Sequence, residues 1–208
     1  MREFTIPTNP YDEDKRLYCR KTVSFEPGLT VLCGCNGSGK STLLRLIRDQ
    51  LKNDDSVCML HFDNYNDGGG HDISKLMFFG DYTSGATMMM SSEGERISQS
   101  VGRFIQKVGT TVRREKPTEV WVLMDAVGSG LSIDGIDEIK DFTEFIRGAE
   151  PGIVFYFVVC TNEYEFAAGS DCVDITTFTH RTFGSYEDYK KLILATRKKK
   201  DKRYGYKE

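Results

Sequence analysis

The chain has 208 residues, of which 39% are hydrophobic and 28% charged, and its formal net charge is −3. This length and apolar content suit one globular domain with a full core and exclude a mainly disordered chain. The longest strongly apolar run, residues 153–160, is far shorter than the roughly 20 residues that cross a bilayer. We expect no secretory signal, and six cysteines without a C-x-x-C pair favour reduced thiols in the cytoplasm.

Strand-like and helix-like segments alternate along the chain, which predicts an α/β layer fold. The expected strands are residues 19–25, 29–34, 57–62, 120–124, 153–159 and 175–183, and the expected helices are 41–52, 93–113, 136–146 and 186–195. We expect a turn at Pro27 and Gly28 to join the first two strands. The continuous apolar run 153–159 is typical of a central parallel strand buried on both faces. Residues 63–90, rich in glycine and polar side chains, are expected to be mostly loop.

The end of the chain is strongly basic. Between positions 190 and 203 only Asp201 opposes eight lysines and arginines. We therefore expect one domain over residues 1–196, followed by a basic tail over residues 197–208. Such a tail either contacts nucleic-acid phosphates or is a solvated, frayed terminus.

A phosphate-binding motif stands between the second expected strand and the first expected helix. Residues 34–41, GCNGSGKS, match G-x-x-x-x-G-K-[ST] at every fixed position. Glycines let backbone N–H groups close around phosphate oxygens, and the start of a helix favours the anion. Lys40 is expected to neutralise the β- and γ-phosphates, and the Ser41 hydroxyl to bind Mg²⁺. The predicted nucleotide-binding residues are Asn36, Gly37, Ser38, Gly39, Lys40, Ser41 and Thr42.

Four segments in this order resemble the motifs of ABC-type ATPases. Residues 36–42 resemble the phosphate loop of that class, 91–96 its signature motif, 120–125 its Walker B strand and 129–131 its D-loop. The resemblance implies a P-loop NTPase fold, with a mainly parallel sheet flanked by helices and an N-terminal antiparallel β element. It also implies ATP and Mg²⁺ as cofactors, with Asp125 and Ser41 on the metal side.

The signature-like segment implies a partner. In this class the signature motif contacts the γ-phosphate held by a second protomer, so the resemblance implies an ATP-dependent homodimer or a pair with a related chain. Ser92, Gly94 and Glu95 would then face the partner's nucleotide. Taken alone, Ser92 with Glu95 equally fits a capping box at a helix start.

The catalytic positions depart from the family. Directly after the Walker B aspartate the family has a glutamate, whereas this chain has Ala126, which cannot orient water or accept a proton. The family's switch histidine corresponds to the region of Asn162, which can form a hydrogen bond but carries no charge. We assign Lys40, Asp125 and Asn162 as the catalytic residues and expect slow or partner-stimulated hydrolysis, since loss of the base costs about 10²–10⁴-fold in rate.

Several other side chains are weaker candidates. Glu163 or Asp134 would replace the missing base, although an ordinary solvated acid is the more common role for each. Tyr11 or Tyr18 would stack on adenine, or belong to the core. Asp63 or Asn64 would serve where the family has a glutamine.

The interval between Lys40 and Ser92 is short. It leaves no room for the helical insert of transporter cassettes, and it holds no heptads of a coiled coil. The leading interpretation is therefore a minimal ABC-type ATPase domain of the DNA-repair-like branch. Two alternatives stay open: a nucleotide-gated binding module without useful turnover, motivated by Ala126, and a P-loop kinase.

Overall fold

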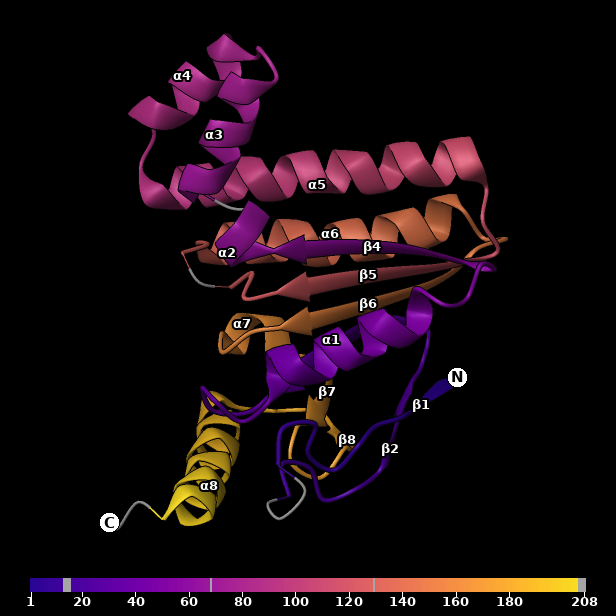
Figure 1. Ribbon diagram of the computed structural model, residues 1–208, viewed down its shortest axis with the longest axis vertical. Coiled ribbons are helices and arrows are strands. Elements are labelled where there is room, and N and C mark those ends of the chain that lie inside the picture. Colours follow the sequence, from indigo (N-terminus) through magenta and orange to yellow (C-terminus); the bar gives the residue numbers. More distant parts are fainter. Residues whose placement is uncertain (13–15, 68, 129, 206–208) are drawn as a thin grey trace.

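The computed structural model describes residues 1–12, 16–67, 69–128 and 130–205. Strands β1 (Arg2–Thr5) and β2 (Thr22–Phe25) pair antiparallel in a small sheet. The main sheet has the order β4-β5-β6-β3-β7-β8, with strands β3 (Gly28–Cys33), β4 (Val57–Asp63), β5 (Glu119–Asp125), β6 (Val154–Cys160), β7 (Asp171–Asp174) and β8 (Thr179–Arg181). Its first five strands are parallel and β8 is antiparallel, which confirms the predicted fold class (Figure 1).

Helices cover both faces of the main sheet (Figure 1). They are α1 (Lys40–Leu51), α2 (Asn64–Asp67), α3 (Gly69–Phe78), α4 (Tyr82–Met90), α5 (Glu93–Glu115), α6 (Ile133–Ala149), α7 (Tyr164–Ala167) and α8 (Tyr186–Tyr204). Helix α1 and the β1–β2 pair pack on one face, and α5 and α6 pack on the other. None of the helices in the described part of the chain is long and apolar enough to cross a membrane.

Strand β6 lies at the centre of the molecule. Phe155, Phe157 and Val159 point into the core under α5 and α6. Tyr156 and Val158 point into the core under α1. Because successive side chains of a strand alternate between faces, an uninterrupted apolar run fits only a strand that is covered on both sides. The predicted central parallel strand is therefore confirmed.

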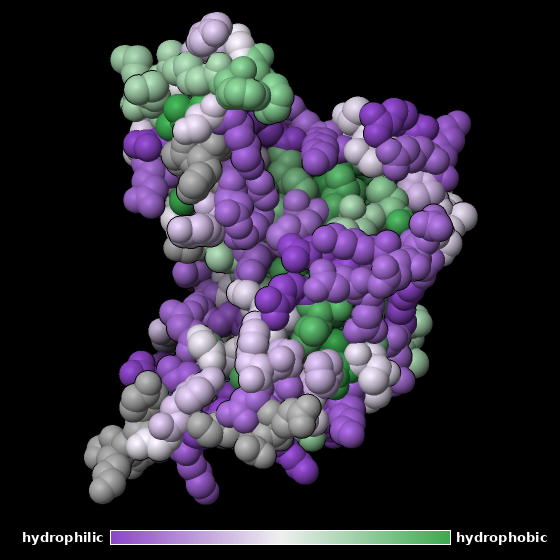
Figure 2. All heavy atoms as spheres, in the orientation of Figure 1, coloured by the Kyte–Doolittle hydropathy of each residue, from purple (hydrophilic) through white to green (hydrophobic). Residues whose placement is uncertain are grey.

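The segment 63–90 is not mostly loop, as we expected, but forms α2, α3 and α4. Figure 1 shows α3 and α4 beyond the edge of the sheet, next to the start of α5. Helix α4 buries only Gly85 and Met88. The sequence therefore has no amphipathic stripe from which this helix could be predicted. Helix α4 ends in three consecutive methionines, of which Met88 is buried and Met89 and Met90 are exposed. Figure 2 shows hydrophobic side chains gathered over the region of α3 and α4.

The two strands expected on either side of Pro27 are present as β2 and β3, but they belong to different sheets. Strand β2 pairs with β1, which was not predicted, whereas β3 enters the main sheet between β6 and β7. The basic segment from residue 197 is not a frayed tail, because α8 continues to Tyr204 and ends at Gly205 in a left-handed conformation. Residues 206–208 lie outside the described part.

Trp121 of β5 is expected to be a dominant contributor to stability. Its ring is fully buried, stacks on Tyr156 at a centroid distance of 4.2 Å, and meets Phe4 and Phe25 edge-on. Replacing Trp121 by alanine should lower the free energy of unfolding by about 3–5 kcal/mol, because it leaves a large cavity. Urea unfolding followed by circular dichroism measures this. The matched control is Phe145→Ala on α6, where the ring is 72% exposed and a change below about 0.5 kcal/mol is expected.

Candidate functional site

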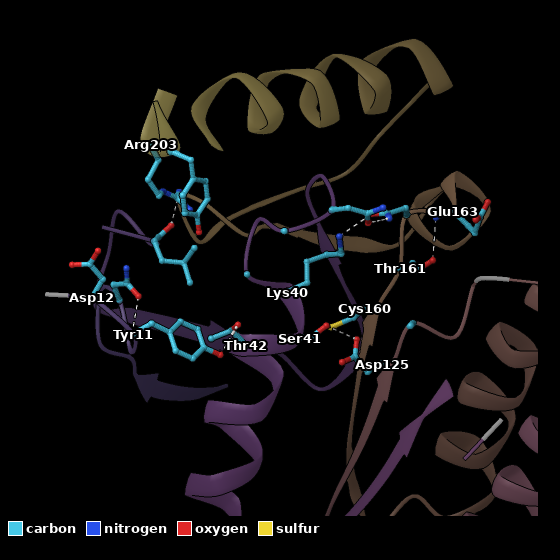
Figure 3. Close-up of a pocket in the computed structure, with 18 residues that line it drawn as sticks. Tyr11, Asp12, Lys40, Ser41, Thr42, Asp125, Cys160, Thr161, Glu163 and Arg203 are labelled. Carbon is cyan, nitrogen blue, oxygen red and sulfur yellow. Dashed lines mark hydrogen bonds between the residues drawn. The ribbon is translucent and has the colours of Figure 1, made fainter. Parts of the chain in front are cut away.

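A cavity of about 540 Å³ opens where the carboxyl ends of β3, β5 and β6 meet (Figure 3). The chain leaves β3 toward one side of the sheet and later leaves β6 toward the other, and ligands of open α/β sheets bind at such switch points. The cavity is lined by Asn9, Tyr11, Asp12, Leu17, Asn36, Gly37, Gly39, Lys40, Ser41, Thr42, Asp125, Ala126, Cys160, Thr161, Asn162, Glu163, Arg203 and Tyr204.

The phosphate loop joins β3 to α1 as the sequence predicts. Gly37 and Gly39 have φ values of 75° and 107°, which side chains rarely adopt, so these glycines allow the loop to curl over the start of α1. Lys40 Nζ donates to Gly34 O at 2.7 Å and to Asn162 Oδ1 at 2.8 Å, at the floor of the cavity. Burial lowers the pKa of Lys40 below its ordinary value, and nearby thiol groups and Asp125 oppose this shift.

Ser41 and Asp125 bring two side-chain oxygen atoms together in the cavity that Lys40 also lines. Ser41 Oγ donates to Asp125 Oδ1 at 3.0 Å. Asp125 ends β5, and in register with it on β4 stands Asp63, which borders a smaller cavity together with Ser41 and Asp125. Mg²⁺ prefers oxygen ligands and is commonly held by one or two protein groups, phosphates and water. A hydroxyl and a carboxylate at this distance fit Mg²⁺, and the described residues contain no cage of three or more His, Cys, Asp or Glu for another metal.

The predicted residue Asn162 reaches the phosphate loop from the end of β6. Its Nδ2 donates to Asn36 Oδ1 and its Oδ1 accepts from Lys40, so it ties the two loops together. The loop after β5 packs closely against the loop after β6. A Cβ added to Gly128 would lie 2.2 Å from Thr161 Oγ1 and 2.6 Å from Glu163 Cγ. Only glycine therefore permits this packing.

Ala126, at the position where the family has a glutamate, lines the cavity. Its backbone φ is 54°, and its carbonyl oxygen accepts a hydrogen bond from Asn64 Nδ2 at 3.2 Å. Of the two candidate substitutes, Glu163 lines the cavity, whereas Asp134 lies outside the lining on the first turn of α6. A hydrogen bond from the Ser132 side chain, with others from backbone N–H groups, lowers the pKa of Asp134, as expected for a solvated carboxylate at a helix start. Of the two candidates, only Glu163 therefore borders the cavity.

The two tyrosines proposed for adenine have different positions. Tyr18 is fully buried, and its hydroxyl donates to Gly39 O at 2.7 Å, so it supports the phosphate loop from the core and cannot stack on a base. Tyr11 lines the cavity, is 65% exposed, and accepts a hydrogen bond from Arg45 at 2.7 Å. Its hydroxyl also lies 3.3 Å from Thr42 Oγ1, at the start of α1. Of these two tyrosines, only Tyr11 is therefore available to a ligand.

The structure gathers most of the predicted site residues but not all. Ser38 is buried beneath the loop and does not line the cavity. Ser92, Gly94 and Glu95 also lie outside the lining. Ser92 begins α5 and forms a complete capping box with Glu95, so the local interpretation of this pair is confirmed. Gly94 packs on the D-loop-like segment, where a Cβ would lie 3.0 Å from Gly130 O; Ser129 of that segment is outside the described residues.

Sequence reasoning missed one part of the site altogether. Arg203 and Tyr204, from the end of α8, form one wall of the cavity (Figure 3). The basic run was visible in the sequence, but nothing local indicates that its last turns face the phosphate loop more than 160 positions earlier.

The comparisons with known proteins agree with the phosphate-loop unit. A family model described as an AAA domain matches residues 15–56, a stretch that contains β2, β3, the phosphate loop and α1. No curated protein is significantly similar to the chain.

Among solved structures, the crystal structure of Cdc6p from Pyrobaculum aerophilum is similar, with 13% identity and a TM-score of 0.39. The likeness covers 68% of this chain and 34% of that one, so this chain spans about a third of the length of that relative. A likeness this distant identifies no function. The parallel sheet, the phosphate loop between β3 and α1, and the AAA-domain match show that the chain has the P-loop NTPase fold.

Proposed function

We propose that this protein binds Mg²⁺–ATP in the cavity at the phosphate loop. The observation that carries the proposal is the position of Lys40. Its ammonium group lies at the cavity floor and donates to Gly34 O and Asn162 Oδ1, and a phosphate oxygen can replace either acceptor. Backbone N–H groups of the loop and the start of α1 favour the same anion. Ser41 and Asp125 supply oxygen ligands for the cation that accompanies the nucleotide.

Equilibrium titration with ATP tests this proposal directly. With Mg²⁺ present, saturable binding is expected at one site per chain. Removal of Mg²⁺ with EDTA should weaken the binding without abolishing it, because Lys40 and the loop N–H groups remain. Asp125→Asn should make the affinity less sensitive to Mg²⁺. Absence of ATP binding under both conditions would refute the function.

We propose further that the protein hydrolyses ATP slowly. In this proposal Lys40 and Asn162 stabilise charge on the γ-phosphate, and Asp125 binds the cation that accompanies it. The hydrogen bonds from Lys40 to Asn162 and from Ser41 to Asp125 support these roles. Ala126 offers no proton acceptor, and Glu163 is the remaining carboxylate in the lining besides Asp12 and Asp125. Activation of water therefore depends on Glu163 or on a group from a partner.

A second candidate function is a nucleotide-gated binding module without useful turnover. Ala126, at the position where a base is expected, is the observation that favours it. A single-turnover assay distinguishes the two functions: a slow ATPase converts bound ATP to ADP over minutes to hours, whereas a pure switch leaves it intact.

The basic segment at the end of α8 gives little support to a nucleic-acid ligand. Three of its cations already donate hydrogen bonds to protein acceptors near the phosphate loop: Lys199, Lys200 and Arg203.

We propose that the ATP-bound form dimerises in the manner of ABC-type ATPases. Ser92 begins the 23-residue helix α5, and the start of α5 lies at the same edge of the sheet as the phosphate loop (Figure 1). A helix start that is exposed at this edge can contact the γ-phosphate of a second protomer.

Light scattering after size exclusion measures the dimer. With Mg²⁺ and ATP the wild-type protein should double in mass, and Ser92→Arg should stay monomeric, because a bulky side chain replaces the capping hydroxyl at the contact. Thr110→Arg, an exposed position on the same helix, is the control and should dimerise normally. A wild-type monomer in the presence of saturating ATP would contradict a homodimer.

A further inference from the structure

The last turns of α8 are attached to the phosphate loop by hydrogen bonds. Cys35 N donates to Thr196 Oγ1 at 2.9 Å, and Thr196 is fully buried. One turn later, Lys200 Nζ donates to Asn36 O at 3.3 Å. The loop that is expected to hold phosphate therefore also fixes where α8 ends.

Arg203, one turn further along, lies in the wall of the nucleotide cavity with part of its guanidinium unsatisfied. Its Nη2 donates to Leu17 O at 3.0 Å. Its Nη1 is buried and has no hydrogen-bond partner within the described part of the chain. A buried donor on a charged group is costly to leave unpaired, so such a group in a ligand cavity points to an acceptor that the ligand brings.

The position of Arg203 identifies which end of the ligand it faces. Figure 3 shows Arg203 at the same end of the cavity as Tyr11 and Asp12, away from Asp125 and Glu163. Lys40, Ser41 and Asp125 hold the triphosphate end, so the opposite end takes the nucleoside.

We propose that Arg203 is a nucleoside-recognising residue: its guanidinium turns toward the cavity when the ligand binds, and Nη1 then donates to an oxygen of the ribose or a ring nitrogen of the base. This proposal rests on the proposed ATP site and adds the C-terminal helix to it. Helix α8 then forms the nucleoside wall opposite the N-terminal segment that carries Tyr11. The basic end of α8 serves the cavity within its own chain, and recognition of the nucleoside depends on a helix that the phosphate-loop motif does not include.

The test compares ATP with inorganic tripolyphosphate, which carries the phosphate chain without the nucleoside. Arg203→Gln should weaken binding of ATP by about tenfold or more, the usual effect of losing a hydrogen bond to a charged group. The same substitution should change the affinity for tripolyphosphate by less than about twofold, because Lys40 and the loop are intact. Lys202→Gln is the matched control: it removes the same charge from an exposed neighbour and should change neither affinity.

The outcomes are distinct. Equal losses for ATP and tripolyphosphate would overturn the proposal, because Arg203 would then act on the phosphates or on the fold. An unchanged ATP affinity in Arg203→Gln would overturn it as well. If the wild-type protein binds neither compound, the proposed ATP site itself fails. Retained binding of tripolyphosphate shows that a variant is folded, and Arg203→Lys, which keeps the charge but lacks Nη1, should reproduce the selective loss.

Discussion

Lys40→Ala is expected to reduce the affinity for ATP by about 100-fold or more and to stop hydrolysis. We propose that the Lys40 ammonium group binds the β- and γ-phosphates, and no other lysine lines the cavity within the described part of the chain. Charge-assisted hydrogen bonds are about twice as strong as neutral ones, and their loss leaves phosphate charge uncompensated. Calorimetric titration with ATP and Mg²⁺ measures the affinity.

Lys52→Ala is the control for this experiment. Lys52 is exposed at the end of α1, the helix that Lys40 begins, so its removal changes the net charge equally without touching the cavity. Its affinity for ATP should match that of the wild type. Because Lys40 also bonds to Gly34 and Asn162, the thermal midpoint of each variant must be recorded. Wild-type affinity in a folded Lys40→Ala protein would refute the phosphate-loop site.

Ala126→Glu is expected to increase the rate of ATP hydrolysis by about 10²-fold or more. The residue follows Asp125 directly and lines the cavity, so a carboxylate here would reach the region of the γ-phosphate and act as general base. The backbone already holds a Cβ at a φ of 54°, and the larger side chain therefore adds little backbone strain. Release of phosphate under saturating ATP measures the rate.

Ala126→Gln separates proton transfer from shape. Glutamine has nearly the size of glutamate but is not a base, so its rate should stay close to that of the wild type. If Ala126→Glu is no faster than Ala126→Gln, water activation is not the limiting step at this position. Glu163→Gln then becomes the informative variant, and a fall in its residual rate would identify Glu163 as the base.

The local features of this fold were predictable from the sequence. The phosphate loop, with its flanking strand and helix, has a fixed spacing of glycine, lysine and serine that acts through backbone geometry. The apolar run of β6 and the stripe of α5 follow from the periods of strands and helices. The phosphate loop is determined by residues that are neighbours in the sequence. Strand β6 and helix α5 require only that their apolar side chains be buried, whichever residues cover them.

Which segments and side chains contact one another across the fold was decided only by the tertiary structure. Asn162 forms hydrogen bonds with Asn36 and Lys40 because β6 lies beside β3. The loop after β6 can pack against Gly128 because glycine has no side chain. Helix α4 shows too little apolar periodicity to be recognised, since it buries only Gly85 and Met88. Arg203 enters the site through packing of α8 on the loop. The contacts of Asn162 and Arg203 join residues more than 120 positions apart. Their energy depends on which surfaces of the folded chain meet, a property that no local sequence pattern encodes.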